Sequence, residues 1–207
     1  MSSYQIQKRI LDLVVASGLM IAFLPFWFLV PLLILFESGP PVFFKHKRVG
    51  KNAKSFYLYK FRSMVKGADR ILHEEDEELL KQFKEGDWKI ANDPRITKLG
   101  KALRSLTIDE FPQLWNVIKG EMSMVGPRAY VKKELIDQVK RYPETKQYLP
   151  LILSVKPGIT GVWQTSGRNE IPFTQRAQMD AEYAQKKSIL YDIKLLFATP
   201  QAMLSKW

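Results

Sequence analysis

Residues 13–36 read LVVASGLMIAFLPFWFLVPLLILF and contain no charged side chain. A helix of this length, which rises about 1.5 Å per residue, matches the ~30 Å hydrocarbon core of a bilayer. The run is too long for a signal peptide, and no small-residue cleavage pattern follows it. The stretch therefore predicts an N-terminal membrane helix, with a buried core helix of a soluble protein as the alternative.

The middle and the flanks of this stretch argue against a simple span. Pro25 removes a backbone donor and clashes with the preceding turn, so a sharp bend is expected there. The positive-inside rule puts both ends in the cytoplasm, because basic residues flank both. We therefore predict a re-entrant helix over residues 1–38, followed by a domain on the cytoplasmic face over residues 39–207. The flanking cations are Lys8, Arg9, Lys45, Lys47, Arg48, Lys51 and Lys54.

Asp12 stands at the edge of the apolar run, three and four positions after Arg9 and Lys8. On a helix these three side chains share a face, where Asp12 can pair with either cation and also suits the helix dipole. The functional alternative is that Lys8 and Arg9 hold a lipid phosphate at the membrane interface. Both interpretations stay open.

Composition limits the classes of protein that the chain can belong to. Its 207 residues, 46% of them hydrophobic, are enough for one domain with a core. The net charge of +11 indicates polyanionic partners, such as nucleic acid, anionic lipid or nucleotide diphosphates. The absence of cysteine excludes disulfides and thiolate zinc sites. His73-Glu74 resembles the start of a zinc-protease helix, but Glu77 stands where the second histidine is required.

After Gly39-Pro40-Pro41 the pattern predicts a β-hairpin, with strands over 42–49 and 55–61. Aromatic and basic residues alternate in the second strand, as in single-stranded nucleic-acid platforms, but the RNA-recognition signature is absent and a half-buried hairpin is favoured. Helical patterning follows over 68–85, 98–104, 110–119, 131–141 and from 174 onward, where Pro200 breaks or restarts the helix. The predicted fold is mostly α with one small β-hairpin.

Two adjacent acids, Asp109 and Glu110, begin one of these helices. Thr107 followed by Glu110 fits a capping box, so a purely structural role is one interpretation. The other starts from the cations in the surrounding sequence, since two carboxylates beside bound phosphate can share Mg²⁺ or supply a nucleophile that forms an acyl-phosphate. Arginines around a diphosphate would balance the charge of phosphoryl transfer. These cations are Arg95, Lys98, Lys101, Arg104 and Arg128.

Three glycine-containing turns, over residues 125–128, 156–161 and 166–169, complete the pattern, and none is a P-loop. Taken in order, the chain resembles the bacterial sugar transferase family, the monotopic phosphoglycosyl transferases. The likeness covers nearly the whole sequence. It rests on Lys8-Arg9 with Asp12, the proline-broken apolar helix, and residues 43–50, 59–64, 92–100, 109–117, 122–128, 156–161, 163–164 and 167–169.

The resemblance implies a transfer of hexose 1-phosphate from a UDP-sugar to polyprenol phosphate, with release of UMP, at the bacterial cytoplasmic membrane. It makes Asp109 the nucleophile of a ping-pong scheme and assigns Mg²⁺ to Asp109 and Glu110. It places Lys8, Arg9 and Asp12 at the lipid interface. The residues that it implies for substrate binding are Lys60, Arg62, Arg104, Arg128, Gln164 and Arg168.

Two details refine this expectation. The family often has a second proline after the arginine of its Pro-Arg-Pro turn, whereas this chain has Ala129, which predicts a less rigid turn around Arg128. The Gly161-Val162-Trp163-Gln164 stretch favours galactose or glucose over N-acetylated sugars. Phospholipid is an expected partner, a homodimer would suit the exposed apolar surface, and nucleic acid is not expected.

The alternative from another class is a membrane-anchored basic protein that binds anionic lipid or nucleic acid without catalysis. It explains the charge and the apolar run but leaves Asp109-Glu110 and the glycine turns without a role. A polytopic transferase that uses no covalent intermediate is disfavoured, because one apolar segment cannot build a polytopic core.

Overall fold

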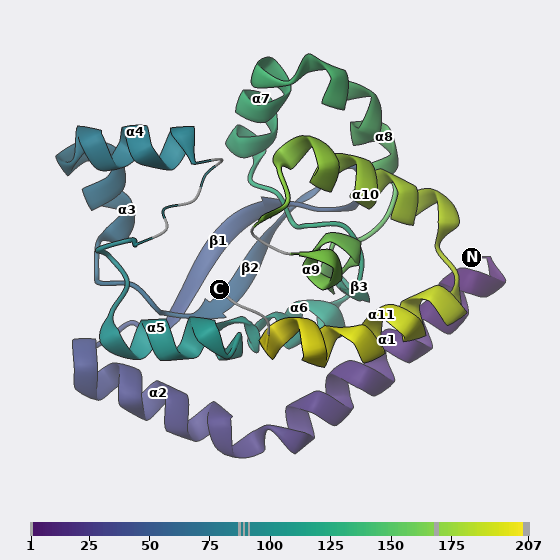
Figure 1. Cartoon of the computed structure of the whole chain (residues 1–207). Coiled ribbons are helices and arrows are strands. Elements are labelled where there is room, and N and C mark those ends of the chain that lie inside the picture. The colour runs from purple at the N-terminus through teal and green to yellow at the C-terminus, as the bar shows by residue number, and fades with distance from the viewer. Residues whose placement is uncertain (1, 87, 89, 91, 168–169, 205–207) are drawn as a thin grey trace.

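The computed structural model describes residues 2–86, 88, 90, 92–167 and 170–204. Two N-terminal helices, α1 (Ser3–Ala22) and α2 (Leu24–Ser38), form a wide V along one side of the molecule. The other helices and both sheets lie above the open side of this V (Figure 1). The helix pair therefore forms a base for the rest of the chain.

The V results from a break between the two helices. α1 begins at a capping box, in which Ser2 Oγ accepts from the Gln5 backbone and Gln5 Oε1 accepts from Ser2. Pro25 lies in the first turn of α2, where a missing N–H is tolerated. The two helices are bent by 62°, which confirms the predicted bend, although the break falls at Phe23. By length and apolar character no single described helix is sufficient for a membrane span, whereas the bent pair taken together is.

The outer surface of the V is apolar and open. Inward-facing Ala16, Val30 and Ile34 are buried against the rest of the chain. A contiguous exposed apolar surface of this kind marks a contact with membrane or protein. Its exposed side chains are Ile6, Ile10, Val14, Ile21, Leu24, Phe28, Leu29, Leu32, Leu33, Leu35 and Phe36.

A two-stranded antiparallel sheet lies at the centre of the molecule (Figure 1). β1 (Phe43–Val49) pairs with β2 (Ser55–Phe61), with Phe43 opposite Phe61 and Val49 opposite Ser55. Phe56 and Leu58 point into the core, while Tyr57 on the other face is exposed. The predicted hairpin is confirmed, and alternation along the strand puts Phe56 and Leu58 on one face.

A second sheet was not predicted. Its strands, β3 (Ser123–Val125) and β4 (Gly158–Thr160), are parallel and only three residues long. They bring two of the glycine-containing turns together. A Cβ on Gly158 would lie 2.1 Å from the backbone nitrogen of Gly126, so no side chain fits at this crossing.

Helices supply most of the remaining structure. They are α3 (Ala68–Arg70), the π-helical turn η2 (Ile71–Glu75), α4 (Glu77–Glu85), α5 (Lys98–Ser105), α6 (Gln113–Lys119), α7 (Lys132–Arg141), α8 (Leu149–Ile152), α9 (Val162–Ser166), α10 (Phe173–Lys186) and α11 (Ile189–Leu204). Short 3₁₀ segments are η1 (Lys51–Ala53), η3 (Ile108–Glu110) and η4 (Pro143–Tyr148).

Three details differ from the sequence-based expectation. The acidic helix over 68–85 is interrupted, because Asp76 has an extended backbone and caps α4 through Leu79 N. Pro200 neither breaks nor restarts α11, which continues through it to Leu204. The capping box at Thr107 is wrong, since Thr107 makes no side-chain cap and its backbone is left-handed.

Contacts between α1 and the body of the protein are polar as well as apolar. Arg9 donates from both Nη atoms, at 2.6 Å, to the carbonyls of Val117 and Ile118 at the end of α6. Such a cation is favourable there, because the last carbonyls of a helix lack partners and carry its negative dipole end. Ala16 of α1 lies in the same core cluster as Val117.

Candidate active site

Asp109 and Glu110 lie in η3, directly after the left-handed Thr107. Ile108 packs with Phe61 of β2 and Leu103 of α5 in one core cluster, and this fixes η3 beneath the hairpin. Asp109 is 2% exposed, whereas a quarter of the Glu110 side chain remains open to solvent. One acid is therefore withdrawn from water and its neighbour is partly open to solvent.

Lys60 of β2 joins the two acids. Its Nζ lies 2.5 Å from Oε1 of Glu110 and 3.7 Å from Oδ2 of Asp109. Lys60 follows Phe56 and Leu58 on the inward face of the strand, so strand alternation delivers it to the acids. Strand β2 and η3 thus bring together three residues that were expected in the site, although Lys60 and Glu110 are 50 positions apart in the sequence.

The pKa values of the two carboxyl groups are shifted in opposite directions, upward for Asp109 and downward for Glu110. Burial raises the pKa of Asp109, Lys60 opposes this shift and the charge of Glu110 adds to it. Burial also acts on Glu110, but its direct ion pair with Lys60 holds the pKa of Glu110 below the usual value. Glu110 is therefore the direct counter-ion of Lys60 in this structure, and Asp109 is the more basic carboxylate.

One oxygen of Asp109, Oδ1, is buried without a hydrogen-bond partner among the described residues. Unsatisfied buried atoms of this kind are rare and indicate a missing ligand or ion. Mg²⁺ binds one or two carboxylates together with substrate phosphate oxygens, so these donors fit it. Within the described residues no group of three or more acids and histidines forms an all-protein metal site.

Arg104 approaches the same site from α5. Its Nε donates to Ser63 Oγ at 2.9 Å, and its positive charge lowers the pKa of Asp109, though less than Lys60 does. The segment before α5 is held by a buried pair, in which Arg95 Nη2 lies 2.6 Å from Asp93 Oδ2. Arg95, one of the cations near Asp109 in sequence, is thus committed to a structural ion pair.

Arg128 enters from the turn after β3. Its backbone N–H donates to Asp180 Oδ2 at 3.1 Å, and its Nε lies 3.7 Å from Glu134 Oε1. Its guanidinium carbon lies 5.5 Å from the centre of the Trp163 ring, a cation–π distance. The charge of Arg128 contributes to the lowered pKa of Glu110, which links the turn electrostatically to η3.

The residues that hold Arg128 were not found from the sequence. Glu134 is buried in α7 and also lies 3.9 Å from Arg48, whose Nη1 donates to the carbonyl of Ala129. Asp180 is buried in α10, one turn after the buried Arg176. The available signal was the pair of charged residues, four positions apart, in the middle of the buried face of α10.

Of the other expected substrate contacts, the structure describes Arg62 and Gln164. Arg62 donates to Ser38 and to the Gly39 carbonyl at the end of α2. Gln164, in α9, has a buried Oε1 without a partner in the described part of the chain. Arg168 lies outside the described residues. Their roles in substrate binding stay predictions.

The expected interface residues of α1 make contacts within the protein. Lys8 Nζ lies 3.4 Å from Asp12 and 3.2 Å from Asp192 of α11, so the pairing between Lys8 and Asp12 is confirmed. Asp12 is buried and also accepts from Ser123 Oγ and Met124 N. The lipid-phosphate role of Lys8 and Arg9 is untested by these contacts and stays a prediction.

The sequence was compared with known proteins and families. Residues 3–206 match the family described as bacterial sugar transferase. The exopolysaccharide production protein ExoY of Sinorhizobium fredii is 38% identical over 97% of this chain and 87% of its own length. The undecaprenyl-phosphate galactose phosphotransferase of Salmonella typhimurium is 38% identical over 99% of this chain and 40% of its own length. The undecaprenyl-phosphate glucose phosphotransferase of Komagataeibacter xylinus is 36% identical over 94% of this chain and 35% of its own length.

These matches cover both the apolar V and the residues that converge on Asp109. The resemblance seen in the motifs is thereby confirmed over the whole chain. The chain belongs to the bacterial sugar transferase family.

Proposed function

We propose that this enzyme transfers a hexose 1-phosphate from a UDP-sugar to polyprenol phosphate through a covalent intermediate on Asp109. The observation that carries the proposal is the environment of Asp109, a buried carboxylate with one unpartnered oxygen beside Lys60. The names of the relatives support the substrate class, since two are undecaprenyl-phosphate sugar phosphotransferases and one is an exopolysaccharide production protein.

The reaction has two displacements at one phosphorus atom. In the first, a carboxylate oxygen of Asp109 forms a bond to the sugar-bearing phosphorus, the bond to the bridging oxygen breaks, and UMP leaves with that oxygen. In the second, a phosphate oxygen of the polyprenol carrier attacks the same phosphorus and the bond to Asp109 breaks. The product is polyprenol diphosphate-sugar, and the Asp109 carboxylate is regenerated.

Two cationic side chains and a metal ion would serve these steps. Lys60 keeps Asp109 ionised against the effect of burial, and a dehydrated carboxylate is a better nucleophile than a hydrated one. Arg128, held by Glu134 and Asp180, is positioned for the phosphate of the departing UMP. Mg²⁺, held by Asp109 and Glu110 with the phosphates, would neutralise charge on the diphosphate.

The acceptor is a lipid, so the site has to lie at a bilayer surface. The exposed apolar surface of α1 and α2, together with their 62° bend, supports a re-entrant hairpin that enters one leaflet and returns. The basic residues on both sides of residues 13–36 support a position of the active site on the cytoplasmic face.

The test is release of UMP from a panel of UDP-sugars with Mg²⁺ and polyprenol phosphate, by the wild type and by Asp109→Asn. We expect release by the wild type and none by the variant. Asp69→Asn, an exposed acid on α3, is the matched control and should retain activity. A donor labelled in the phosphate next to the sugar should label the wild-type protein when the acceptor is withheld.

Retained activity in Asp109→Asn would refute the nucleophile, and label that remains on that variant would do the same. No turnover of any UDP-sugar by the wild type would favour a binding protein without catalysis. The panel also identifies the sugar, for which the sequence favours galactose or glucose.

A further inference from the structure

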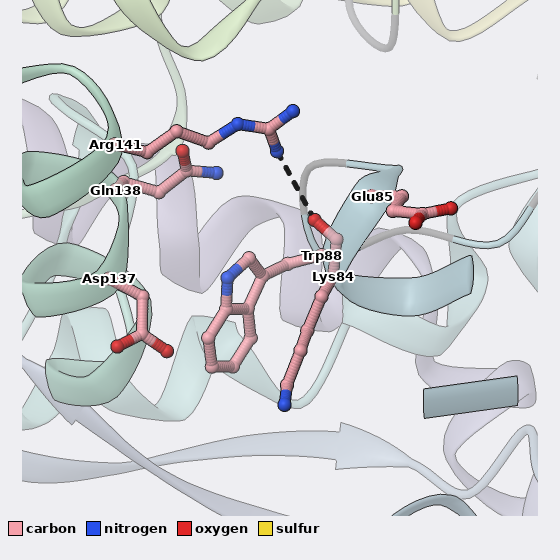
Figure 2. Close-up of a pocket in the computed structure, with 6 residues that line it drawn as sticks. All are labelled: Lys84, Glu85, Trp88, Asp137, Gln138 and Arg141. Atoms are coloured by element: carbon pink, nitrogen blue, oxygen red, sulfur yellow. Dashed lines mark hydrogen bonds between the residues drawn. The ribbon is translucent and has the colours of Figure 1, made fainter. Parts of the chain in front are cut away.

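A recess of about 440 Å³ lies between the end of α4 and α7, away from the acids of η3. Figure 2 shows the Trp88 indole inside it, with the Lys84 side chain along one side and Asp137 and Gln138 across from it. The size falls in the range of small-molecule sites. Its lining residues are Lys84, Glu85, Trp88, Asp137, Gln138 and Arg141.

The walls of the recess are connected to each other. Arg141 Nη1 donates to the Lys84 carbonyl at 3.3 Å, which ties the end of α7 to the end of α4 (Figure 2). Trp88 is held by its backbone bond to the Phe83 carbonyl and by an edge contact between the two rings at 5.3 Å. The indole therefore stands as a supported, partly buried platform.

Helix α7 connects this recess to the phosphate end of the proposed site. Glu134, which contacts Arg128, and Gln138, which lines the recess, are both 2% exposed. They are four residues apart, which places them one turn and about 6 Å apart along the helix. The recess therefore lies about one helical turn along α7 from the residue that contacts Arg128, a separation within the length of a nucleotide.

The recess has no net formal charge, because Lys84 and Arg141 are balanced by Glu85 and Asp137. It is thus unsuited to a phosphate group and suited to a flat neutral ring with a polar edge. The indole of Trp88 offers a stacking surface of the kind that binds bases. Asp137 is an acceptor when ionised, while Arg141 and Lys84 are donors.

Uracil matches this arrangement. Its pairing edge carries one donor, N3–H, between two carbonyl acceptors, whereas cytosine has an acceptor at N3 and an amino donor beside it. We propose that the recess binds the uracil of the donor nucleotide, with Trp88 stacking on the ring, Asp137 accepting from N3–H, and Arg141 with Lys84 donating to the carbonyls. This assignment rests on the proposed function, since it names the base site of the same donor.

The test is the KM for a UDP-sugar, kcat, and inhibition by UMP and by CMP in Trp88→Ala, Trp88→Phe and Asp137→Asn. Trp88→Ala should raise KM and the inhibition constant of UMP about tenfold, which equals about 1.4 kcal/mol, with kcat changed less than about threefold. Trp88→Phe should restore most of the loss. Asp137→Asn should weaken inhibition by UMP but not inhibition by CMP, so the preference of the enzyme for UMP becomes smaller. Lys133→Ala, on the exposed face of α7, is the control.

The outcomes separate the base site from the reaction. If the wild type turns over a UDP-sugar while Trp88→Ala and Asp137→Asn keep wild-type KM and UMP inhibition, the base lies elsewhere and this assignment is overturned. If the wild type turns over no UDP-sugar, equilibrium dialysis can still measure whether UMP and CMP bind to the wild type and to Trp88→Ala. Binding of UMP that is lost in Trp88→Ala would then support the recess, and equal binding by both proteins would refute it.

Discussion

The backbone N–H of Arg128 donates a hydrogen bond to Oδ2 of Asp180, 52 positions later in the chain, at 3.1 Å. The same oxygen accepts from the Tyr130 hydroxyl at 3.0 Å, so one carboxylate holds both sides of Ala129. Arg48 fixes the carbonyl of Ala129 itself. Side chains from α10 and β1 thereby provide the rigidity that a second proline in this turn would supply.

Replacing Asp180 should loosen this turn. Asp180→Ala leaves two buried donors unpaired and should cost about 1–3 kcal/mol of unfolding free energy, together with a loss of kcat/KM for the UDP-sugar. Asp180→Asn keeps an acceptor and should retain most activity. Burial raises the pKa of Asp180 to about 7, although Arg128 and Arg176 oppose the shift, so ionisation destabilises the fold. Thermal unfolding should therefore show the wild type losing stability relative to Asp180→Asn as pH rises from 4 to 7. A constant difference across that range would contradict the assignment.

Asp109→Asn should abolish turnover and at the same time stabilise the protein. Burial raises the pKa of Asp109, so its charge costs stability at neutral pH, and that cost is absent below the unfolded pKa of about 3.9. A gain on the order of 1 kcal/mol would raise Tm by about 2–4 °C at this chain length. Thermal melts at pH 4 and pH 7 measure it. A lower Tm at pH 7 would show that the charged carboxylate is well compensated.

Lys60→Met should move the acidic limb of the pH–rate profile to higher pH. Lys60 opposes the rise in the pKa of Asp109, so without it Asp109 becomes protonated at a higher pH. The expected kcat falls by about 10²-fold or more, as for loss of one group that stabilises transferred charge. Lys45→Met, an exposed lysine on the opposite face of the hairpin, is the control. An unchanged acidic limb in Lys60→Met would show that Lys60 does not set the pKa of Asp109.

Thr107→Gly tests the left-handed backbone that precedes the acids. With φ at 58°, Thr107 carries a strain of about 1–2 kcal/mol that glycine does not, partly offset by the greater freedom of glycine in the unfolded chain. Chemical denaturation should therefore show equal or slightly greater stability. Thr107→Val retains the shape and removes the hydroxyl, whose oxygen is buried without a partner among the described residues. Loss of activity in both variants would indicate that the Thr107 hydroxyl contacts the substrate. Loss of activity in Thr107→Gly alone would indicate that the site needs a rigid backbone at this position.

The topology of the helix pair can be read by single-cysteine labelling, because the chain has no cysteine of its own. In membrane vesicles, Ser2→Cys and Lys54→Cys should react with a charged thiol reagent from the same side. Phe28→Cys, on the exposed apolar surface, should be protected until detergent is added. If Ser2→Cys and Lys54→Cys were labelled from opposite sides, the helix pair would span the membrane and the re-entrant hairpin would be wrong.

Local patterns predicted the parts of the fold that depend on neighbouring residues. The hairpin of residues 43–61 followed from alternation, and α5 and α7 from helical spacing. The parallel pair β3 and β4 was not predicted, because a strand of three residues shows no detectable period. Their pairing also joins residues that are far apart in the sequence, Ser123 and Gly158. The glycine turns had been noticed, but their mutual contact is a long-range property.

The candidate site divides in the same way. Asp109 and Glu110 were identified through their motif, and Lys60 through the family resemblance alone. The positioning acids Glu134 and Asp180 were missed, because each has an ordinary helical context and acquires its role only when α7 and α10 pack beside Arg128. Thr107 was misread because a β-branched residue rarely adopts the left-handed backbone that it has here, so its residue type indicated a cap.

Helix α1 is joined to the body of the enzyme by Arg9, by Asp12 and by the burial of Ala16 in a shared core. Deleting the N-terminal segment to obtain a water-soluble fragment would uncover the apolar surface around Val117 and Met122 and leave the last carbonyls of α6 without donors. Detergent, nanodiscs or a redesigned exterior of the V are the practical routes to a purified active protein, since the proposed membrane segment is also part of the scaffold that carries the candidate site.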